Sequence, residues 1–290
     1  MNLVVGATGL LGGEICRLLA GEGKPVRALA RHTSDKTKVA ELERLGVEVV
    51  RGDLKDRSSL DAACRGVRTV ISTASSTLSR QEGDTIESVD RDGQLSLVDA
   101  ARAEGVEHFI LVSFPDMNIE FPLQTAKREV EQHLKESGLA YTILQPTFFM
   151  EVWLSPALGF DAAGASAQIY GAGRAPISWV SYRDVARFAA ACVDNPEARG
   201  AVIELGGPEA LSPSEVVRIF EEAAGRKFNV SHVTEEQLKA QKESAADALQ
   251  ESFAGLMLAC ARGQAVDMRG TLRRFPVRLT SVREYAGRVV

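Results

Sequence analysis

The feature that most constrains this chain is the heptapeptide Gly6-Ala7-Thr8-Gly9-Leu10-Leu11-Gly12, which separates a short apolar run from an amphipathic segment. Residues 3–5 are typical of a buried strand, and residues 11–22 have the apolar spacing of a helix. Glycines with this spacing between a strand and a helix let backbone N–H groups and a helix N-terminus approach a pyrophosphate. The heptapeptide therefore predicts a dinucleotide-binding loop; the alternative is a glycine-rich turn without a ligand.

The next part of the chain alternates strands with helices, which predicts right-handed crossovers and a parallel sheet. We therefore expect an α/β fold with a doubly wound parallel sheet of the Rossmann type. Its predicted strands are residues 3–5, 25–30, 47–51, 69–73, 108–113, 140–144 and 202–205, and its predicted helices are residues 11–22, 35–45, 56–64, 86–103, 123–136 and 183–193.

A second, smaller lobe is expected beside the sheet. Residues 1–150 are predicted to form the nucleotide-binding domain, to which residues 178–205 return. Residues 151–177, rich in glycine and proline, form a loop-rich excursion, and residues 206–290 turn mainly helical. Together, residues 151–177 and 206–290 are predicted to make a substrate or partner lobe.

Composition excludes several other classes of protein. The 34 basic and 39 acidic residues give a net charge of −5, which argues against nucleic-acid binding. The four cysteines are far apart without a CxxC pair, so we expect no metal site and a reduced compartment, the cytoplasm. We see neither a signal peptide nor an apolar run long enough to span a membrane. A monomer and a homodimer both remain open.

The end of the second predicted strand bears on the cofactor. An NAD site places an acid there to accept from the ribose 2′-hydroxyl. This chain has Arg31 instead, with Ser34 and Lys36 nearby, and a guanidinium suits a phosphate. We therefore predict that NADP(H) is preferred over NAD(H). Two alternatives stay open: Arg31 is a solvated surface residue, or Asp35 folds back to the ribose.

Other residues follow the predicted strands at the edge where such sheets bind ligands. Asp53, next to Leu54, is either an acceptor for the adenine amino group or a turn residue. Small residues at Thr73, Ala74 and Ser75 leave room for the ribose and pyrophosphate.

Eight stretches of the sequence resemble the NmrA-like branch of the atypical short-chain dehydrogenases/reductases, over roughly residues 1–225. That group includes NADPH-dependent reductases of quinones and plant phenolic compounds, as well as NADP-binding regulators and photosystem assembly factors. The stretches are G-A-T-G-L-L-G (6–12), V-R-A-L-A-R (26–31), G-D-L-K-D (52–56), V-D-R-D-G (89–93), G-V-E-H-F-I-L-V-S-F (105–114), Y-T-I-L-Q-P-T-F-F-M-E (141–151), W-V-S-Y-R-D-V-A-R-F (179–188) and L-G-G-P-E-A-L-S (205–212).

The resemblance implies roles for particular residues. Gly6, Gly9 and Gly12 match the glycine motif, Arg31 matches the arginine at the 2′-phosphate, and Asp53 matches the acid at the adenine. Lys127 matches the active-site lysine, and residues 146–149 match the segment lining the nicotinamide. Two positions depart from the usual pattern: Leu123 stands where a proton-donating tyrosine would precede Lys127 by four residues, and Gln145 replaces an arginine.

These residues predict an NAD(P)H-dependent oxidoreductase, of quinone-reductase or isoflavone-reductase type, that passes a hydride to a small aromatic, enone or quinone-like acceptor. Lys127 would stabilise the developing oxyanion, unless it is a surface lysine paired with Glu131. The aromatic cluster after residue 147 is either the acceptor pocket or core. The main alternative is a non-catalytic NADP(H)-binding regulator or assembly factor that binds a protein partner. A sugar-nucleotide epimerase or dehydratase is disfavoured by the absent tyrosine.

The predicted site therefore has three parts. Lys127 is the predicted catalytic residue. The predicted cofactor-binding residues are Gly6, Ala7, Thr8, Gly9, Leu10, Leu11, Gly12, Arg31, Ser34, Lys36, Asp53, Leu54, Thr73, Ala74, Ser75, Ser113, Lys127, Pro146, Thr147, Phe148 and Phe149. The predicted substrate pocket consists of Phe114, Phe149, Met150 and Trp153.

Overall fold

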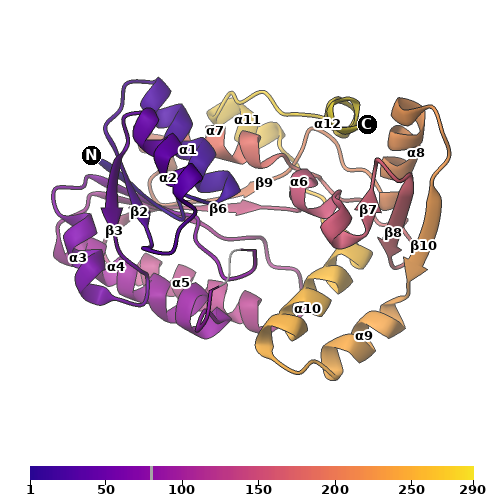
Figure 1. The fold of residues 1–290 in the computed structure, drawn as a ribbon, viewed down its shortest axis with the longest axis horizontal. Helices are drawn as coiled ribbons and strands as arrows, with labels where there is room; N and C mark the ends of the chain where they lie inside the picture. Colours follow the sequence, from indigo (N-terminus) through magenta and orange to yellow (C-terminus); the bar gives the residue numbers. More distant parts are fainter. Residues whose placement is uncertain (79–80) are drawn as a thin grey trace. The chain divides into compact units, whose positions relative to one another are not determined.

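A computed structural model describes residues 1–78 and 81–290 (Figure 1). The chain divides into two compact units, each made of several segments. The first unit contains Met1–Ser113, Leu123–Gln145 and Val185–Ile203, and the second contains Phe114–Pro122, Pro146–Asp184 and Glu204–Val290. Residues 114–122, 146–150, 178–184 and 204–205, which we expected in the first domain, cluster with the second unit.

A seven-stranded sheet in the order β3-β2-β1-β4-β5-β6-β9 confirms the expected Rossmann-type architecture. β1 pairs in parallel with β2 and β4, and β5 pairs in parallel with β4 and β6. The chain moves outward from β1 in one direction and then returns to place β4 on its other side, so the order reverses between β1 and β4. The strands are β1 Asn2–Val5, β2 Val26–Ala30, β3 Glu48–Arg51, β4 Thr69–Ser72, β5 His108–Val112, β6 Ala140–Pro146 and β9 Ala201–Leu205.

Helices cover both faces of this sheet. Figure 1 shows α1 and α2 on one side of it and α3, α4 and α5 on the other. One core cluster packs the apolar faces of the second group, including Leu60, Leu97 and Val130, against Leu3 and Phe109. The helices are α1 Leu10–Gly21, α2 Lys36–Arg44, α3 Arg57–Cys64, α4 Gln94–Ala103, α5 Pro122–Glu136 and α7 Tyr182–Cys192.

The segment expected as one helix over residues 86–103 begins with a π-helix over Ile86–Gly93, which then continues as α4. A capping box at Thr85 and Ser88 starts the π-helix. Wider π-turns are uncommon and recur at functional sites. The 3.6-residue periodicity did not reveal this change because the π-helix spans only eight residues, which is too short for its wider turns to alter the apolar pattern visibly.

The second unit contains a small sheet that the sequence did not predict. β8, Ser166–Tyr170, pairs in parallel with β10, Asn229–Val233, and antiparallel with β7, Phe160–Asp161. Two of these strands fall in the segment we expected to be irregular, because strands this short give little periodicity. Residues 206–290, expected to be mainly helical, also contain β10. The helices of this unit are α6 Met150–Trp153, α8 Pro213–Ala224, α9 Glu235–Glu243, α10 Ala248–Arg262, α11 Arg269–Arg274 and α12 Val282–Val289.

Three helices begin at caps that can be recognised in the sequence itself. The Asp56 carboxylate caps α3, and capping boxes begin α8 at Ser212 and α12 at Ser281. These local signals succeed because a cap needs only residues within one turn of each other.

The described residues show three further properties. None of the helices in residues 1–78 and 81–290 has the length and apolar character that crossing a bilayer requires. In the same ranges, no three or more His, Cys, Asp or Glu side chains gather where they could hold a metal ion. All four cysteines are buried.

Substitution at Gly12 should destabilise the first unit. A Cβ there would lie 2.3 Å from the Gly6 carbonyl oxygen, which is backbone and cannot move aside. Gly21, in the same helix, has no atom within 4 Å of its hypothetical Cβ. We expect Gly12→Ala to cost about 2 kcal/mol or more of unfolding free energy, whereas Gly21→Ala gains up to about 1 kcal/mol. Urea denaturation of the two variants measures this; equal midpoints would contradict it.

His108 gives the first unit a pH-dependent stability. Its side chain is buried in β5, and Nε2 donates 2.8 Å to Thr142 Oγ1, which itself donates 2.7 Å to the Ala198 carbonyl. Burial, with the positive charge of Arg199, lowers the pKa of His108 from 6.5 to about 4.

The imidazole is therefore neutral in the folded chain, while the unfolded chain takes up a proton below pH 6.5. Stability should be unaffected above that pH and fall by about 3 kcal/mol between pH 6.5 and 4. His108→Gln, which keeps a donor but does not titrate, should remove this loss in urea denaturation at several pH values. The exposed control His32→Gln should retain it; a His108→Gln profile as steep as that of the wild type would refute the assignment.

Candidate functional site

The glycine loop packs against the carboxyl end of β4. Gly6 has a φ of +84°, which favours glycine, and a Cβ there would lie 2.6 Å from Thr73 Oγ1. Thr73 in turn binds the Val5 carbonyl through both its backbone N–H and its hydroxyl. The predicted residues of the loop and of segment 73–75 are therefore brought together, as the sequence indicated.

The N-terminus of α1 is suited to an anion. Its N-cap residue is Gly9, which provides no side-chain hydrogen bond to the first turn. Gly9 and Leu10 are exposed, while Leu11 and Gly12 are buried against the sheet. Amide groups at such an end carry partial positive charge. The loop thus fits the pyrophosphate of a dinucleotide at the point where the strand order reverses.

Arg31, at the end of β2, forms an ion pair that the sequence did not predict. Its guanidinium lies 2.5 Å from Asp84 Oδ2, while Lys55 Nζ lies 2.5 Å from Asp84 Oδ1. Burial opposes ionisation of Asp84, but the hydrogen bonds from Lys55 and Arg31 outweigh it and lower the pKa of this carboxyl. Arg31 is therefore neither a solvated surface residue nor an isolated cation.

Asp35, the residue that could have reached the ribose, has another role. Its carboxylate caps α2 by accepting from the N–H groups of Thr37, at 2.7 Å, and Lys38, at 3.3 Å. These hydrogen bonds lower its pKa. Ser34 donates its backbone N–H to the Arg31 carbonyl, and Lys36 is exposed at the first position of α2.

Asp53 lies in a turn after β3 that is braced from α3. Its backbone N–H donates to Ser59 Oγ, and its carboxylate accepts from the Lys55 N–H at 2.9 Å. This is the geometry of a turn acid. Its side chain is half-buried, and Leu54 beside it is buried. Contact of either residue with an adenine stays a prediction.

Lys127 is buried on α5 and is paired across the structure rather than along its own helix. Its Nζ lies 3.2 Å from Oδ1 of Asp90, whose side chain is fully buried in the π-helix. The other oxygen, Oδ2, accepts from Ser76 N at 2.9 Å and from Ser76 Oγ at 2.7 Å. Because Ser76 follows segment 73–75, the lysine is linked through Asp90 to the residues beside the glycine loop.

Glu131, the alternative partner of Lys127, binds other groups. It lies 2.8 Å from Arg128 and accepts from Gln145 Nε2 at 3.0 Å. Arg128 also donates to Ser113 Oγ at 3.1 Å, at the end of β5. Gln145, which departs from the usual arginine, therefore belongs to a polar cluster at the carboxyl ends of β5 and β6.

The remaining predicted residues belong to the second unit. Phe148 is buried and packs edge-on against Trp153 at 4.8 Å between ring centroids; it also contacts Trp179 at 6.2 Å. Thr147 donates its hydroxyl to the Ser178 carbonyl, and Met150 is fully buried. These contacts make the aromatic cluster part of this unit's core.

Phe149 and Phe114, in contrast, are half-buried. Phe149 forms an isolated parallel bridge with Val180, and Phe114 stacks on Phe121 at 6.1 Å. Buried Pro146 ends β6. Trp153 is half-buried as well, so three of the four predicted pocket residues keep some exposed surface.

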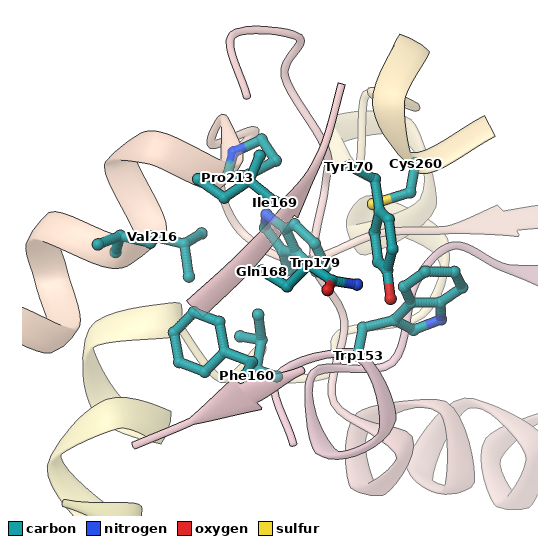
Figure 2. A pocket seen from close by; sticks show the side chains of 11 residues that line it. Trp153, Phe160, Gln168, Ile169, Tyr170, Trp179, Pro213, Val216 and Cys260 are labelled. Carbon is teal, nitrogen blue, oxygen red and sulfur yellow. The ribbon is translucent and has the colours of Figure 1, made fainter. Parts of the chain in front are cut away.

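A small cavity adjoins the same aromatic core (Figure 2). Trp153, Tyr170, Trp179 and Cys260 are among its lining residues, and its free volume is about 20 Å³. That is room for about one water molecule and not for an aromatic ring. A larger, open pocket of about 530 Å³ in this unit is lined by residues in 207–210, 266–269, 272 and 277–279, none of which was a predicted site residue.

Four residues of this region were missed from the sequence: Lys55, Ser76, Asp84 and Asp90. Asp90 lies within the V-D-R-D-G stretch, so its position in a motif was a usable signal. The sequence contained no such signal for Asp84, because its partners Arg31 and Lys55 are 53 and 29 residues away along the chain.

Comparison with known proteins agrees with this fold. The NmrA-like family model matches residues 2–272. An NAD(P)H azoreductase of Xenophilus azovorans is 33% identical over 262 residues, covering 88% of this chain and 86% of the relative. The photosystem II assembly factor Ycf39 of Cyanophora paradoxa is 31% identical over 237 residues, covering 80% and 71%.

Among solved structures, the NADPH complex of the quinone oxidoreductase QOR2 of Escherichia coli aligns with a TM-score of 0.81 at 22% identity, covering 100% of this chain and 99% of that one. At that identity the likeness establishes the fold. With the family match over nearly the whole chain, it leads to one conclusion: the chain belongs to the NmrA-like family.

Proposed function

We propose that this chain is an NAD(P)H-dependent reductase that transfers a hydride to a small aromatic, enone or quinone-like acceptor. The observation that carries the proposal is the buried Lys127–Asp90 ion pair, which Ser76 connects to the segment packed on the glycine loop. A buried lysine is rare unless it is paired, and its position beside a dinucleotide loop favours a catalytic role. The azoreductase relative supports the same class of reaction.

The residues fit the cofactor at the pyrophosphate end. The Gly9 N-cap leaves the first turn of α1 without a side-chain cap, and Gly6 and Gly12 keep the loop flat against β4. When bound, the reduced nicotinamide supplies the hydride. The chain's part is to hold the pyrophosphate on the amides of the loop.

Lys127 provides positive charge for the negative charge that develops on an acceptor oxygen. Asp90 offsets the cost of burying that ammonium, and Ser76 fixes the carboxylate with two hydrogen bonds. Since Leu123 occupies the position of the usual tyrosine, the proton for the reduced acceptor comes from water or from another residue of the cleft. Lys127 would also bind the nicotinamide ribose hydroxyls.

The second candidate is an NADP(H)-binding regulator or assembly factor. Leu123 in place of the tyrosine favours it, as does the relationship to Ycf39. This function requires the same cofactor loop but no electron acceptor. The two candidates therefore differ in whether the chain oxidises NADPH with an electron acceptor.

The reductase proposal is tested by following NADPH oxidation at 340 nm with a panel of quinones, enones and azo dyes. We expect turnover with at least one acceptor, and a fall in kcat of about tenfold or more in Lys127→Met. Lys135→Gln, an exposed substitution near the end of the same helix, is the control and should match the wild type.

Because Lys127→Met leaves Asp90 unpaired, Lys127→Met/Asp90→Asn separates loss of stability from loss of chemistry: it should fold better than the single variant and stay slow. Cofactor binding without oxidation by any acceptor would instead favour the regulator. In that case, cofactor-dependent capture of one specific partner would support it.

We also propose that NADP(H) is preferred over NAD(H). Arg31 provides the cation at the end of β2, and Asp35 is held at the N-terminus of α2, away from a role at the ribose. Arg31→Gln should weaken NADPH binding by about tenfold or more and change NADH binding by less than about twofold. Calorimetry with both cofactors measures this. Equal affinity of the wild type for the two cofactors would rule the preference out.

A further inference from the structure

Asp84 joins two cations from different strands at the edge where the adenosine end of a cofactor would lie. Each carboxylate oxygen binds one of them at 2.5 Å: Oδ2 binds Arg31, which follows β2, and Oδ1 binds Lys55, which follows β3. The carboxylate is therefore shared between two donors that face one anion. Two cations held in this way are also the arrangement that recognises a phosphate.

Two further contacts hold this carboxylate in place. The Gln81 backbone N–H donates to Asp84 Oδ2 at 3.0 Å, and Gln81 Oε1 accepts from Thr33 Oγ1. Thr33 lies two residues after Arg31, so the segment that carries Asp84 is tied to the loop after β2. The position of Asp84 is fixed by several independent bonds and does not depend on the Arg31 pair alone.

Exposure differs sharply within the group. The Asp84 side chain is 1% exposed, whereas Arg31 is 25% and Lys55 is 32% exposed. The cations therefore present a surface to solvent, with the carboxylate beneath them. Two positive charges and one negative charge leave a net charge of +1, half of what the cations alone would present to an incoming anion.

We propose that Asp84 and the 2′-phosphate of an adenine nucleotide compete for Arg31 and Lys55, which makes Lys55 the second 2′-phosphate-binding cation and Asp84 the residue that limits the preference for NADP(H). This rests on the adenine-nucleotide site of the proposed function. A phosphate monoester carries more negative charge than a carboxylate and three acceptor oxygens, so it can replace Asp84 on both cations. Nucleotides without a 2′-phosphate have nothing to exchange and should be insensitive to Asp84.

The test uses two fragments that differ only in the 2′-phosphate: adenosine 2′,5′-bisphosphate and adenosine 5′-monophosphate. Calorimetry with the full chain compares the wild type with Asp84→Asn and Lys55→Gln. Asp84→Asn should bind the bisphosphate about tenfold tighter, and Lys55→Gln about tenfold more weakly. Binding of the monophosphate should change by less than about twofold in both variants.

Matched controls carry the same charge changes elsewhere in the first unit. Asp61→Asn removes a carboxylate from an exposed ion pair with Arg57 on α3, and Lys135→Gln removes an exposed cation on α5. Both should leave the two affinities within about twofold of the wild type. The double variant Asp84→Asn/Lys55→Gln should lose most of the gain from Asp84→Asn if the two residues act on one phosphate.

Each way in which the proposal can fail gives a different experimental result. A wild type that binds neither fragment nor NADPH contradicts the adenine-nucleotide site itself. Weaker bisphosphate binding by Asp84→Asn overturns the competition and makes Asp84 a residue that positions Arg31. Equal affinities in all variants remove both residues from recognition. If Asp84→Asn lowers the thermal midpoint below a usable range, Asp84→Ser replaces it, with the same expected direction.

Discussion

The close contact between the glycine loop and the end of β4 is the constraint on which the first unit depends. Gly12 lies directly over the Gly6 carbonyl oxygen, and Gly6 lies against Thr73, so α1, β1 and β4 meet with no room for a side chain. This contact sets the direction of α1 and aims its N-terminus at the reversal of strand order. The same absence of side chains leaves backbone amides able to approach a pyrophosphate. Packing and anion binding therefore have one physical origin.

Two buried carboxylates organise the charges around that loop. Asp90 holds Lys127 beside the end of β4, and Asp84 holds Arg31 and Lys55 beside the ends of β2 and β3. In both cases a cation predicted from the sequence to bind a ligand is also bound by an acid of the chain. Burying an ammonium or concentrating two cations is costly without a counter-charge. The acids keep these cations in place, and they also set how strongly each can act on another anion.

The second unit shows where an aromatic pattern permits two interpretations. Phe148, Met150 and Trp153 follow β6 in the sequence as a pocket lining would, yet Phe148 and Met150 are buried among their own neighbours. The cavity beside Trp153 has room for about one water molecule. Phe149 and Phe114 keep part of their surface exposed. Periodicity and composition identify apolar residues, but burial is decided by packing partners that are distant along the chain.

The sequence alone was enough for the Rossmann architecture, the glycine loop and the caps of α3, α8 and α12, because each depends on residues close together in the chain or on a strand–helix alternation. It was also enough for the family, because eight short stretches carry the resemblance. Only the tertiary structure decided that Lys127 pairs with Asp90 rather than Glu131, and that Arg31 shares Asp84 with Lys55. It also decided the π-helix and the small sheet of the second unit. An ion pair forms between whichever charges the fold brings within a few ångströms of each other. The number of residues between two charges in the sequence does not determine that distance.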